Sequence, residues 1–113
     1  MDEDDFGCDM RGLLSFQVMW LLSREPMHGE GIAKEIAKRR GNKPKAGTLY
    51  PALKELKEKK LIHGEKKGKM IVYSLTSEGK KDVKRASMYF YRSFGDIFES
   101  VEYHFEHTEQ RSD

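Results

Sequence analysis

The sequence has few of the features that mark secreted or membrane proteins. Its 113 residues contain one cysteine, Cys8, and three prolines. One thiol cannot form an internal disulfide, which favours a reducing compartment. No apolar run approaches the roughly 18 residues of a membrane-spanning helix. The start, Met1–Asp5, is acidic where a secretory signal peptide is basic. We therefore expect a cytoplasmic protein with a single core.

Signatures of catalysis and metal binding are also missing. The sequence has no glycine-rich phosphate loop, no paired-cysteine motif and no evident nucleophile–base pair. His104 and His107 lie three residues apart, but a metal site needs three or four ligands, so a solvated helix end explains them better. Nothing distinguishes His63 from an ordinary exposed histidine. We expect no enzyme, no cofactor and no metal, and the roles of Cys8 and the C-terminal histidines stay open.

The net charge of the chain is small, but positive charge is concentrated in its middle. The formal net charge is +2, yet residues 24–85 hold 18 Lys and Arg against 8 Asp and Glu. The remainder holds 3 Lys and Arg against 11 Asp and Glu. A basic middle between acidic ends indicates a polyanionic partner for the middle. The alternative is a charge-rich surface of the kind common in heat-adapted proteins.

Hydrophobic periodicity predicts two helices in the first 40 residues of the chain. Residues 10–23 are apolar nearly all round, which predicts a helix buried on more than one side. We favour a core position for Trp20 in this helix over a place in a ligand pocket. Residues 26–29 break the pattern. A second amphipathic helix is predicted at about residues 29–40.

The stretch after the next turn, residues 46–60, has the pattern of a helix that contacts nucleic acid. Three leucines at helical spacing form an apolar face. The other side carries a phenol and two lysines, Tyr50, Lys54 and Lys57. Pro51 is expected near the first turn, because deeper inside it would break the helix. Alone, this face is as well explained by solvated lysines, but helix, short turn and basic helix is the order of a helix-turn-helix unit.

Two short strands are predicted directly after this helix, at residues 61–65 and 70–75. The hairpin tip between them carries one glycine and three ammonium groups, those of Lys66, Lys67 and Lys69. Such a hairpin after a DNA-contacting helix is typical of a wing that touches a phosphate backbone or a minor groove. The predicted fold is mainly α with a small β-hairpin, and the winged helix-turn-helix domain is expected over residues 10–76.

A long C-terminal dimerisation helix is predicted over residues 77–107, capped by the hydroxyl of Thr76 or Ser77. Its apolar side chains follow a heptad-like spacing, which aromatic residues widen. So small a chain has too little core to bury them, so a second copy is expected to cover them together with the helix at residues 10–23. The expected dimer contacts are Phe90, Phe94, Ile97, Phe98 and Val101. Residues 1–9 are expected to form an acidic flexible tail, and residues 108–113 a frayed end.

Three motifs in this order resemble the PadR family of transcription regulators. They are Met27–Ile32, Gly47–Leu56 with Leu61–Ile62, and Tyr73–Gly79. The resemblance covers about residues 13–85. It implies a winged helix-turn-helix that dimerises through its C-terminal helix, and a repressor that leaves an inverted-repeat operator when a small aromatic or cationic compound binds. The short C-terminal region is similar to the family's single-helix subgroup.

The resemblance also implies roles for single residues. Thr48, Tyr50 and Pro51 fall where the family's recognition helix meets DNA, and His28 falls in a structural motif with a phosphate contact. Lysines around this helix and on the wing are expected to neutralise phosphates. The complete expected DNA surface is His28, Lys43, Lys45, Thr48, Tyr50, Pro51, Lys54, Lys57, Lys66, Lys67 and Lys69.

Two positions of the sequence depart from the family's pattern. Glu30 stands where an aromatic residue, commonly tyrosine, is usual, and Lys60 stands where glycine is usual.

Trp20 and Phe94 are candidates for an effector pocket at the dimer interface, as the resemblance would allow. We favour core packing for both, because aromatic area stabilises a small dimer.

These observations predict a homodimeric, sequence-specific DNA-binding repressor that recognises a palindromic operator. Two alternatives remain. The first is a winged-helix adaptor whose lysine face meets an acidic protein, and the second is an architectural DNA binder without sequence preference. The sequence does not specify the operator, the target genes, the effector, or whether the protein represses or activates.

Overall fold

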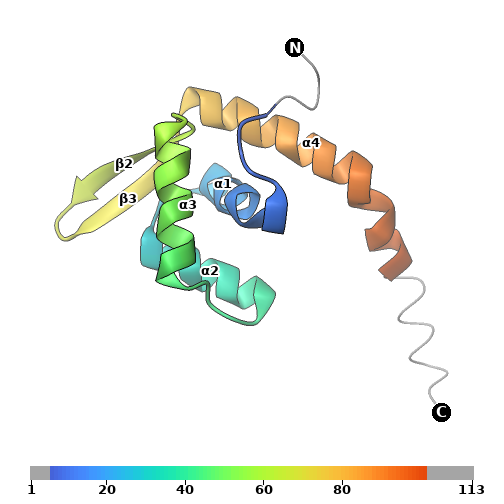
Figure 1. Cartoon of the computed structure of the whole chain (residues 1–113), viewed down its shortest axis with the longest axis horizontal. Coiled ribbons are helices and arrows are strands. Elements are labelled where there is room, and N and C mark those ends of the chain that lie inside the picture. The colour runs from blue at the N-terminus through green and yellow to red at the C-terminus, as the bar shows by residue number, and fades with distance from the viewer. Residues whose placement is uncertain (1–5, 102–113) are drawn as a thin grey trace.

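The computed structural model describes residues 6–101 (Figure 1). The elements follow in the order η1 (Arg11–Leu13), α1 (Leu14–Arg24), β1 (Met27–His28), α2 (Gly29–Arg40), α3 (Ala46–Glu58), β2 (Ile62–Lys67), β3 (Met70–Leu75) and α4 (Ser77–Ser100). The predicted fold class is confirmed, because helices dominate and the strands form one small antiparallel sheet. Within this range, no helix is both long and apolar enough to cross a membrane.

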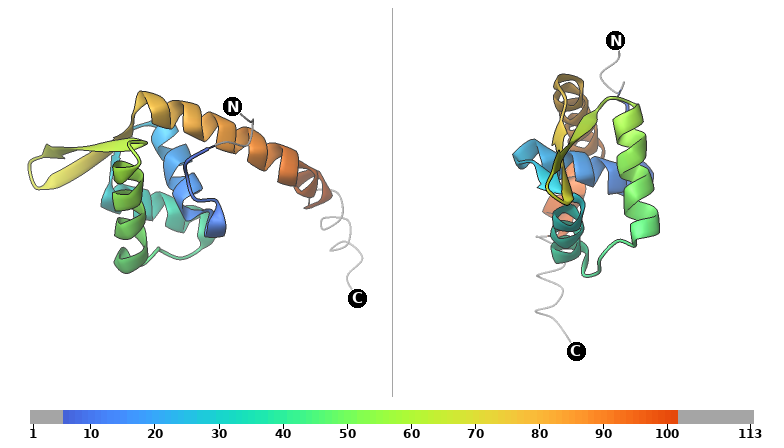
Figure 2. Two further views of the ribbon diagram at one scale, coloured as in Figure 1. Left: turned by 45° about the horizontal axis from the view of Figure 1, so that its top comes forward. Right: turned by 90° about the vertical axis from the view of Figure 1, so that its left-hand side faces the viewer.

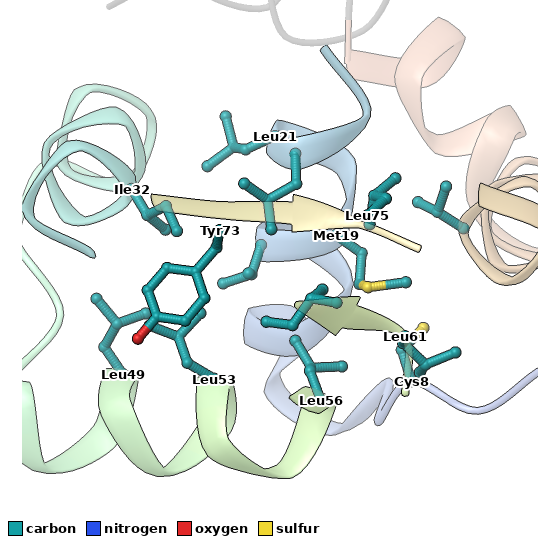
Figure 3. Packing of buried hydrophobic residues seen from close by; sticks show 14 of the residues in the cluster. Cys8, Met19, Leu21, Ile32, Leu49, Leu53, Leu56, Leu61, Tyr73 and Leu75 are labelled. Carbon is teal, nitrogen blue, oxygen red and sulfur yellow. The ribbon is translucent and has the colours of Figure 1, made fainter. Parts of the chain in front are cut away.

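Helix α1 lies at the centre, and α2, α3, β3 and α4 pack around it (Figures 1 and 2). Because α1 is enclosed in this way, its apolar residues face several neighbours, as the sequence predicted. From α3, three fully buried leucines point into the same core, close to Tyr73 of the sheet (Figure 3). They are Leu49, Leu53 and Leu56. The apolar face of α3 is therefore fixed in the core, and its opposite face is turned to solvent.

The position of Pro51 differs from the prediction. Helix α3 begins at Ala46, so Pro51 lies in the second turn and not in the first. Its ring nitrogen cannot donate to the carbonyl of Gly47, four residues earlier. That carbonyl belongs to the first turn of the helix, so the missing bond leaves the rest of the helix intact.

The sheet has the strand order β1–β3–β2 and contains one strand that the sequence did not predict. Met27 of β1 pairs with Tyr73 and His28 pairs with Val72, in the segment expected to be only a break. The strand β2 also runs further than expected, so that Lys66 and Lys67 lie on the strand. The turn itself is formed by Gly68, which has a φ of 63°, and Lys69. The strand β1 thus fixes the start of α2 beside the wing.

The chain leaves α3 through a Schellman turn centred on Lys60. Its φ is 61°, in the left-handed region that glycine prefers. The amide of Lys60 donates to the carbonyl of Lys57 at 2.9 Å, and the amide of Leu61 donates to the carbonyl of Leu56 at 3.0 Å. The glycine that the family usually has here would adopt this conformation without strain.

Replacing Lys60 with glycine should therefore stabilise the protein, although glycine costs more backbone entropy on folding. Relief of the left-handed strain stabilises the folded state by about 1–2 kcal/mol. The entropy cost of glycine offsets about 0.5–1 kcal/mol of this gain. We expect the free energy of unfolding to rise by about 0.5–1 kcal/mol, measured by chemical denaturation. Lys59→Gly, one residue earlier in right-handed backbone, is the control and should destabilise, through backbone entropy and through loss of the ammonium contact with the carbonyl of Gly7. An equal loss of stability in both variants would show that the backbone of Lys60 is not strained.

The expected flexible tail at residues 1–9 is wrong for its last part. The carboxylate of Asp82 in α4, which is only 2% exposed, accepts the amides of Gly7 and Cys8. The ammonium of Lys59 donates to the carbonyl of Gly7 at 2.9 Å. A buried carboxylate must be hydrogen-bonded, and here the N-terminal segment supplies the donors. Because donors and acceptor lie so far apart in the chain, local composition could not reveal the contact.

Cys8 is consequently a core residue, and it is 4% exposed. Burial, reinforced by the nearby charge of Asp82, raises the pKa of its thiol to about 12. The thiolate is the reactive form of cysteine, so Cys8 is unreactive at neutral pH. Its role, which the sequence left open, is therefore that of a buried core residue.

Helix α4 begins with a cap on Thr76 and not on Ser77. The amide of Gly79 donates to the hydroxyl of Thr76 at 3.0 Å, and that hydroxyl donates to the carbonyl of Lys60 at 2.7 Å. The helix then runs away from the core (Figure 1). Its predicted end at residue 107, together with His104 and His107, lies outside the described residues.

Candidate nucleic-acid interface

One face of the protein combines the solvent side of α3, the turn before it and the wing. All eleven residues of the expected DNA surface are exposed, except His28, which is half-buried. Lys45, Lys54, Lys57, Lys66, Lys67 and Lys69 form no ion pair within residues 6–101. Their positive charges are therefore available to an anionic partner.

The structure divides the expected DNA surface into groups. Thr48 and Pro51 border one hollow together with Lys43 and Lys45. Tyr50 lies in a second groove, of about 250 Å³, between the start of α2 and the wing, with His28 and Lys69. The lysines Lys54, Lys57, Lys66 and Lys67 border neither of these hollows. The first turns of α3 and the wing thus present hydroxyl, phenol and ammonium groups side by side.

Tyr50 is held against the start of α2. It is 46% exposed, and a Cβ atom on Gly29 would lie 2.5 Å from its hydroxyl oxygen. Only glycine at position 29 leaves this space for the ring. The neighbouring Tyr73 is buried, and this burial, with a smaller contribution from Tyr50, raises the pKa of its phenol. The Tyr50 ring is thus positioned by α2 and the sheet. The sequence predicted that Tyr50 faces outward, but it did not reveal these neighbours.

An ion pair on this face was not visible in the sequence. The ammonium of Lys43, in the turn before α3, donates to the carboxylate of Glu30 in the first turn of α2. The hydrogen bond from Lys43 lowers the pKa of Glu30, and the charge of Lys34 acts in the same direction. Thirteen residues separate the partners, so no helical periodicity relates them. Among the expected phosphate contacts, Lys43 is therefore already paired within the chain.

A third hollow, of about 520 Å³, lies where α1 meets α4. Trp20 lines it with two further aromatic rings, those of Phe16 and Phe90, and with Arg40. Phe94 does not line the hollow, and its ring centroid lies 5.1 Å from that of Phe90. Of the two candidate effector residues, the structure thus places Trp20 at a cavity and Phe94 just beyond it.

The apolar side chains of α4 beyond this hollow are uncovered in the single chain. Ile97 and Phe98 are 53% and 56% exposed, and Phe94 and Val101 are also exposed. Phe90 is half-buried because its ring packs against Phe16 of α1, with centroids 5.4 Å apart. In the described segment, no group of three or more His, Cys, Asp or Glu is placed to hold a metal ion.

Comparison with known proteins agrees with this geometry. Residues 18–85 match the profile of the transcriptional regulator PadR-like family. An uncharacterised 37.1 kDa protein in transposon TN4556 of Streptomyces fradiae is 33% identical over 85 residues, which are 74% of this chain but only 25% of that protein. The chain therefore spans about a quarter of this relative's length.

Solved structures show the same fold. A PadR family transcriptional regulator from Eggerthella lenta is 27% identical with a TM-score of 0.66, covering 82% of this chain and 85% of its own. The H. salinarum protein RosR, in the complex hsRosR-S1, is 25% identical with a TM-score of 0.65, covering 86% and 90%. A transcriptional regulator from Clostridium thermocellum, 24% identical, gives a TM-score of 0.69 over 81% and 96% and shows the fold. The chain therefore belongs to the PadR-like family of transcriptional regulators.

Proposed function

We propose that the protein is a cytoplasmic, homodimeric repressor that binds a palindromic operator and is released by a small molecule. The observation that carries this proposal is the solvent side of α3, where Thr48, Tyr50 and Pro51 are exposed on a helix whose other side is locked into the core. A helix held in this way can enter the major groove as a rigid element.

In the proposed complex, the two ends of the face have different tasks. The first turns of α3 contact base edges through Thr48 and Tyr50, because the major groove presents a distinct pattern for each base pair. Lysines before α3 and on the wing contact phosphates, which position the protein without reading sequence. The N-cap of α3, Lys45, makes no side-chain cap hydrogen bond, and free amides at a helix start favour a phosphate.

In the proposed dimer, the uncovered apolar side chains of α4 meet those of a second copy, as expected for Phe90, Phe94, Ile97, Phe98 and Val101. The exposed fractions of the last four support this role, because burying apolar area yields about 25 cal/mol per Å². A two-fold dimer places two recognition helices about 34 Å apart, or at a multiple of this spacing. The operator is then palindromic, with half-sites separated by that distance.

Selection of genomic fragments by the purified protein, followed by anisotropy measurements on the selected duplex, tests the proposal. We expect a two-fold symmetric site, a dimer by light scattering, and a preference of about 10³ or more over random duplex. Affinity should fall steeply with salt, because each neutralised phosphate releases counterions. A monomer in solution, or affinity for duplex DNA that does not change with salt, would contradict the proposal.

The same experiment separates the two alternatives. An architectural binder would show a specificity ratio near one. A protein adaptor would bind no duplex and would instead retain an acidic partner. The exposed lysines of the face suit either alternative, but the phenol of Tyr50 held beside them favours contact with bases.

The hollow between α1 and α4 is the proposed effector site, and Trp20 reports on it. Aromatic compounds are expected to quench Trp20 fluorescence and to lower operator affinity in the same concentration range, because the hollow is lined by Phe16, Trp20 and Phe90. A library of aromatic acids, amines and neutral compounds tests this, with duplex binding measured in parallel. Phe16→Ala should weaken the quenching, whereas Tyr91→Ala, on the exposed surface of α4, should not. Trp20 fluorescence that no compound alters would exclude the site.

A further inference from the structure

Glu30 places a negative charge on the face that is otherwise suited to DNA. It lies in the groove that also contains His28, Tyr50 and Lys69. Its carboxylate accepts from the ammonium of Lys43. Both side chains of the pair are about half exposed, so that an incoming phosphate can reach Lys43 from solvent.

The pair connects two parts of the proposed DNA surface. Lys43 also borders the hollow that contains Thr48 and Pro51, at the first turns of α3. A phosphate that contacts Lys43 must share or replace the carboxylate that already occupies its ammonium. An exposed pair of this kind is worth little in free energy, so DNA can displace it, but at a cost to affinity.

We propose that Glu30 sets the DNA affinity of this protein by occupying the ammonium of Lys43, which a DNA phosphate must take over at each half-site. This inference rests on the proposed function. Because phosphate contacts carry no sequence information, Glu30 lowers affinity for operator and random duplex by the same factor. The lowered pKa of Glu30 agrees with this role, since its carboxylate remains charged and paired at neutral pH.

Glu30→Gln is the direct test, because it removes the charge and keeps the size of the side chain. Loss of an exposed ion pair corresponds to a gain of about two- to fivefold for each subunit. For a dimer on two half-sites the gains multiply to about four- to 25-fold. The dependence of log K on log salt should change little, because Lys43 neutralises the same DNA phosphate in both proteins and the released counterions come from the DNA.

Glu35→Gln is the matched control on the same helix. Glu35 also pairs with lysine and arginine, Lys38 at 2.8 Å and Arg39 at 3.0 Å. It lies five residues further along, about 140° around α2 at 100° per residue. This variant makes the same change in net charge and should alter duplex affinity less than twofold. A second control repeats Glu30→Gln in a Lys43→Met background, where the gain should disappear.

The possible outcomes distinguish this inference from the proposed function. Equal affinities for the Glu30→Gln and Glu35→Gln variants, while the wild-type protein binds its operator, would overturn the inference alone. A gain that persists without Lys43 would do the same. NMR titration of the free protein gives a readout without DNA, since the pKa of Glu30 should rise toward its ordinary value in Lys43→Met. If wild-type protein binds no duplex at all, the proposed function fails and this inference with it.

Discussion

Replacing Tyr50 with alanine is expected to reduce operator affinity by about 1–3 kcal/mol, roughly five- to 150-fold, while binding to random duplex changes little. The ring lies on the solvent side of α3, in the space that the missing Cβ atom of Gly29 leaves at the start of α2. Its loss removes a contact with bases and leaves the surrounding lysines unchanged. Anisotropy titrations of operator and scrambled duplex at one salt concentration measure both affinities.

Lys69→Ala provides the matched comparison on the wing. It should weaken binding to operator and random duplex alike and lower the salt slope by about one. Because Tyr50 is largely outside the core, thermal melting should show that the Tyr50→Ala variant remains folded. An equal loss of operator and random binding on Tyr50→Ala would show that the phenol does not contribute to sequence recognition.

The largest expected effect on stability belongs to Gly79→Ala. A Cβ atom at Gly79 would lie 1.9 Å from the carbonyl oxygen of Leu61 and 2.9 Å from its carbonyl carbon. These are backbone atoms of the turn after α3, so no side-chain rotation relieves the overlap. Overpacking costs about 1–3 kcal/mol and occasionally more. We expect about 3 kcal/mol, which lowers Tm by more than about ten degrees in a domain of this size.

Gly47→Ala is the control for this substitution. A Cβ atom there meets no atom within 4 Å, and Gly47 lies in the first turn of α3. Alanine forms helix more readily than glycine by about 1 kcal/mol, so this variant should melt at the same temperature or higher. Thermal melting is followed by circular dichroism. A Gly79→Ala variant that melts no lower than Gly47→Ala would mean that the Leu61 turn yields to the added methyl group.

Sequence patterns predicted most of the fold because its helices are amphipathic and its hairpin is rich in branched residues. Residues 29–40 were predicted and observed as one helix, since their apolar stripe begins after Gly29 and their end is marked by Gly41. The strand β1 was missed because two residues, Met27 and His28, have no period to detect. Its pairing depends on Tyr73 and Val72, which follow far later in the chain.

The candidate site was predictable in its residue types but not in its internal contacts. Exposure of Thr48, Tyr50 and Lys54 follows from the helical positions of the buried leucines. The pairing of Lys43 with Glu30 depends on how the turn after α2 folds back, which no local pattern encodes. The contact of Asp82 with the N-terminal segment is of the same kind, and it moved Cys8 from an expected tail into the core. Contacts of these residues with DNA stay predictions.

The contacts of the Leu61 carbonyl fix how α3 is oriented relative to α4, and this bears on the half-site spacing of the operator. It accepts the amide of Thr76 at 3.0 Å, and Gly79 packs directly against it. The end of α3 and the start of α4 therefore form one rigid corner. In the proposed dimer, the distance between the two recognition helices then depends on where two copies meet along α4. Substitutions near Ile97 and Phe98 can change which half-site spacing is accepted, while every residue that touches a base stays the same.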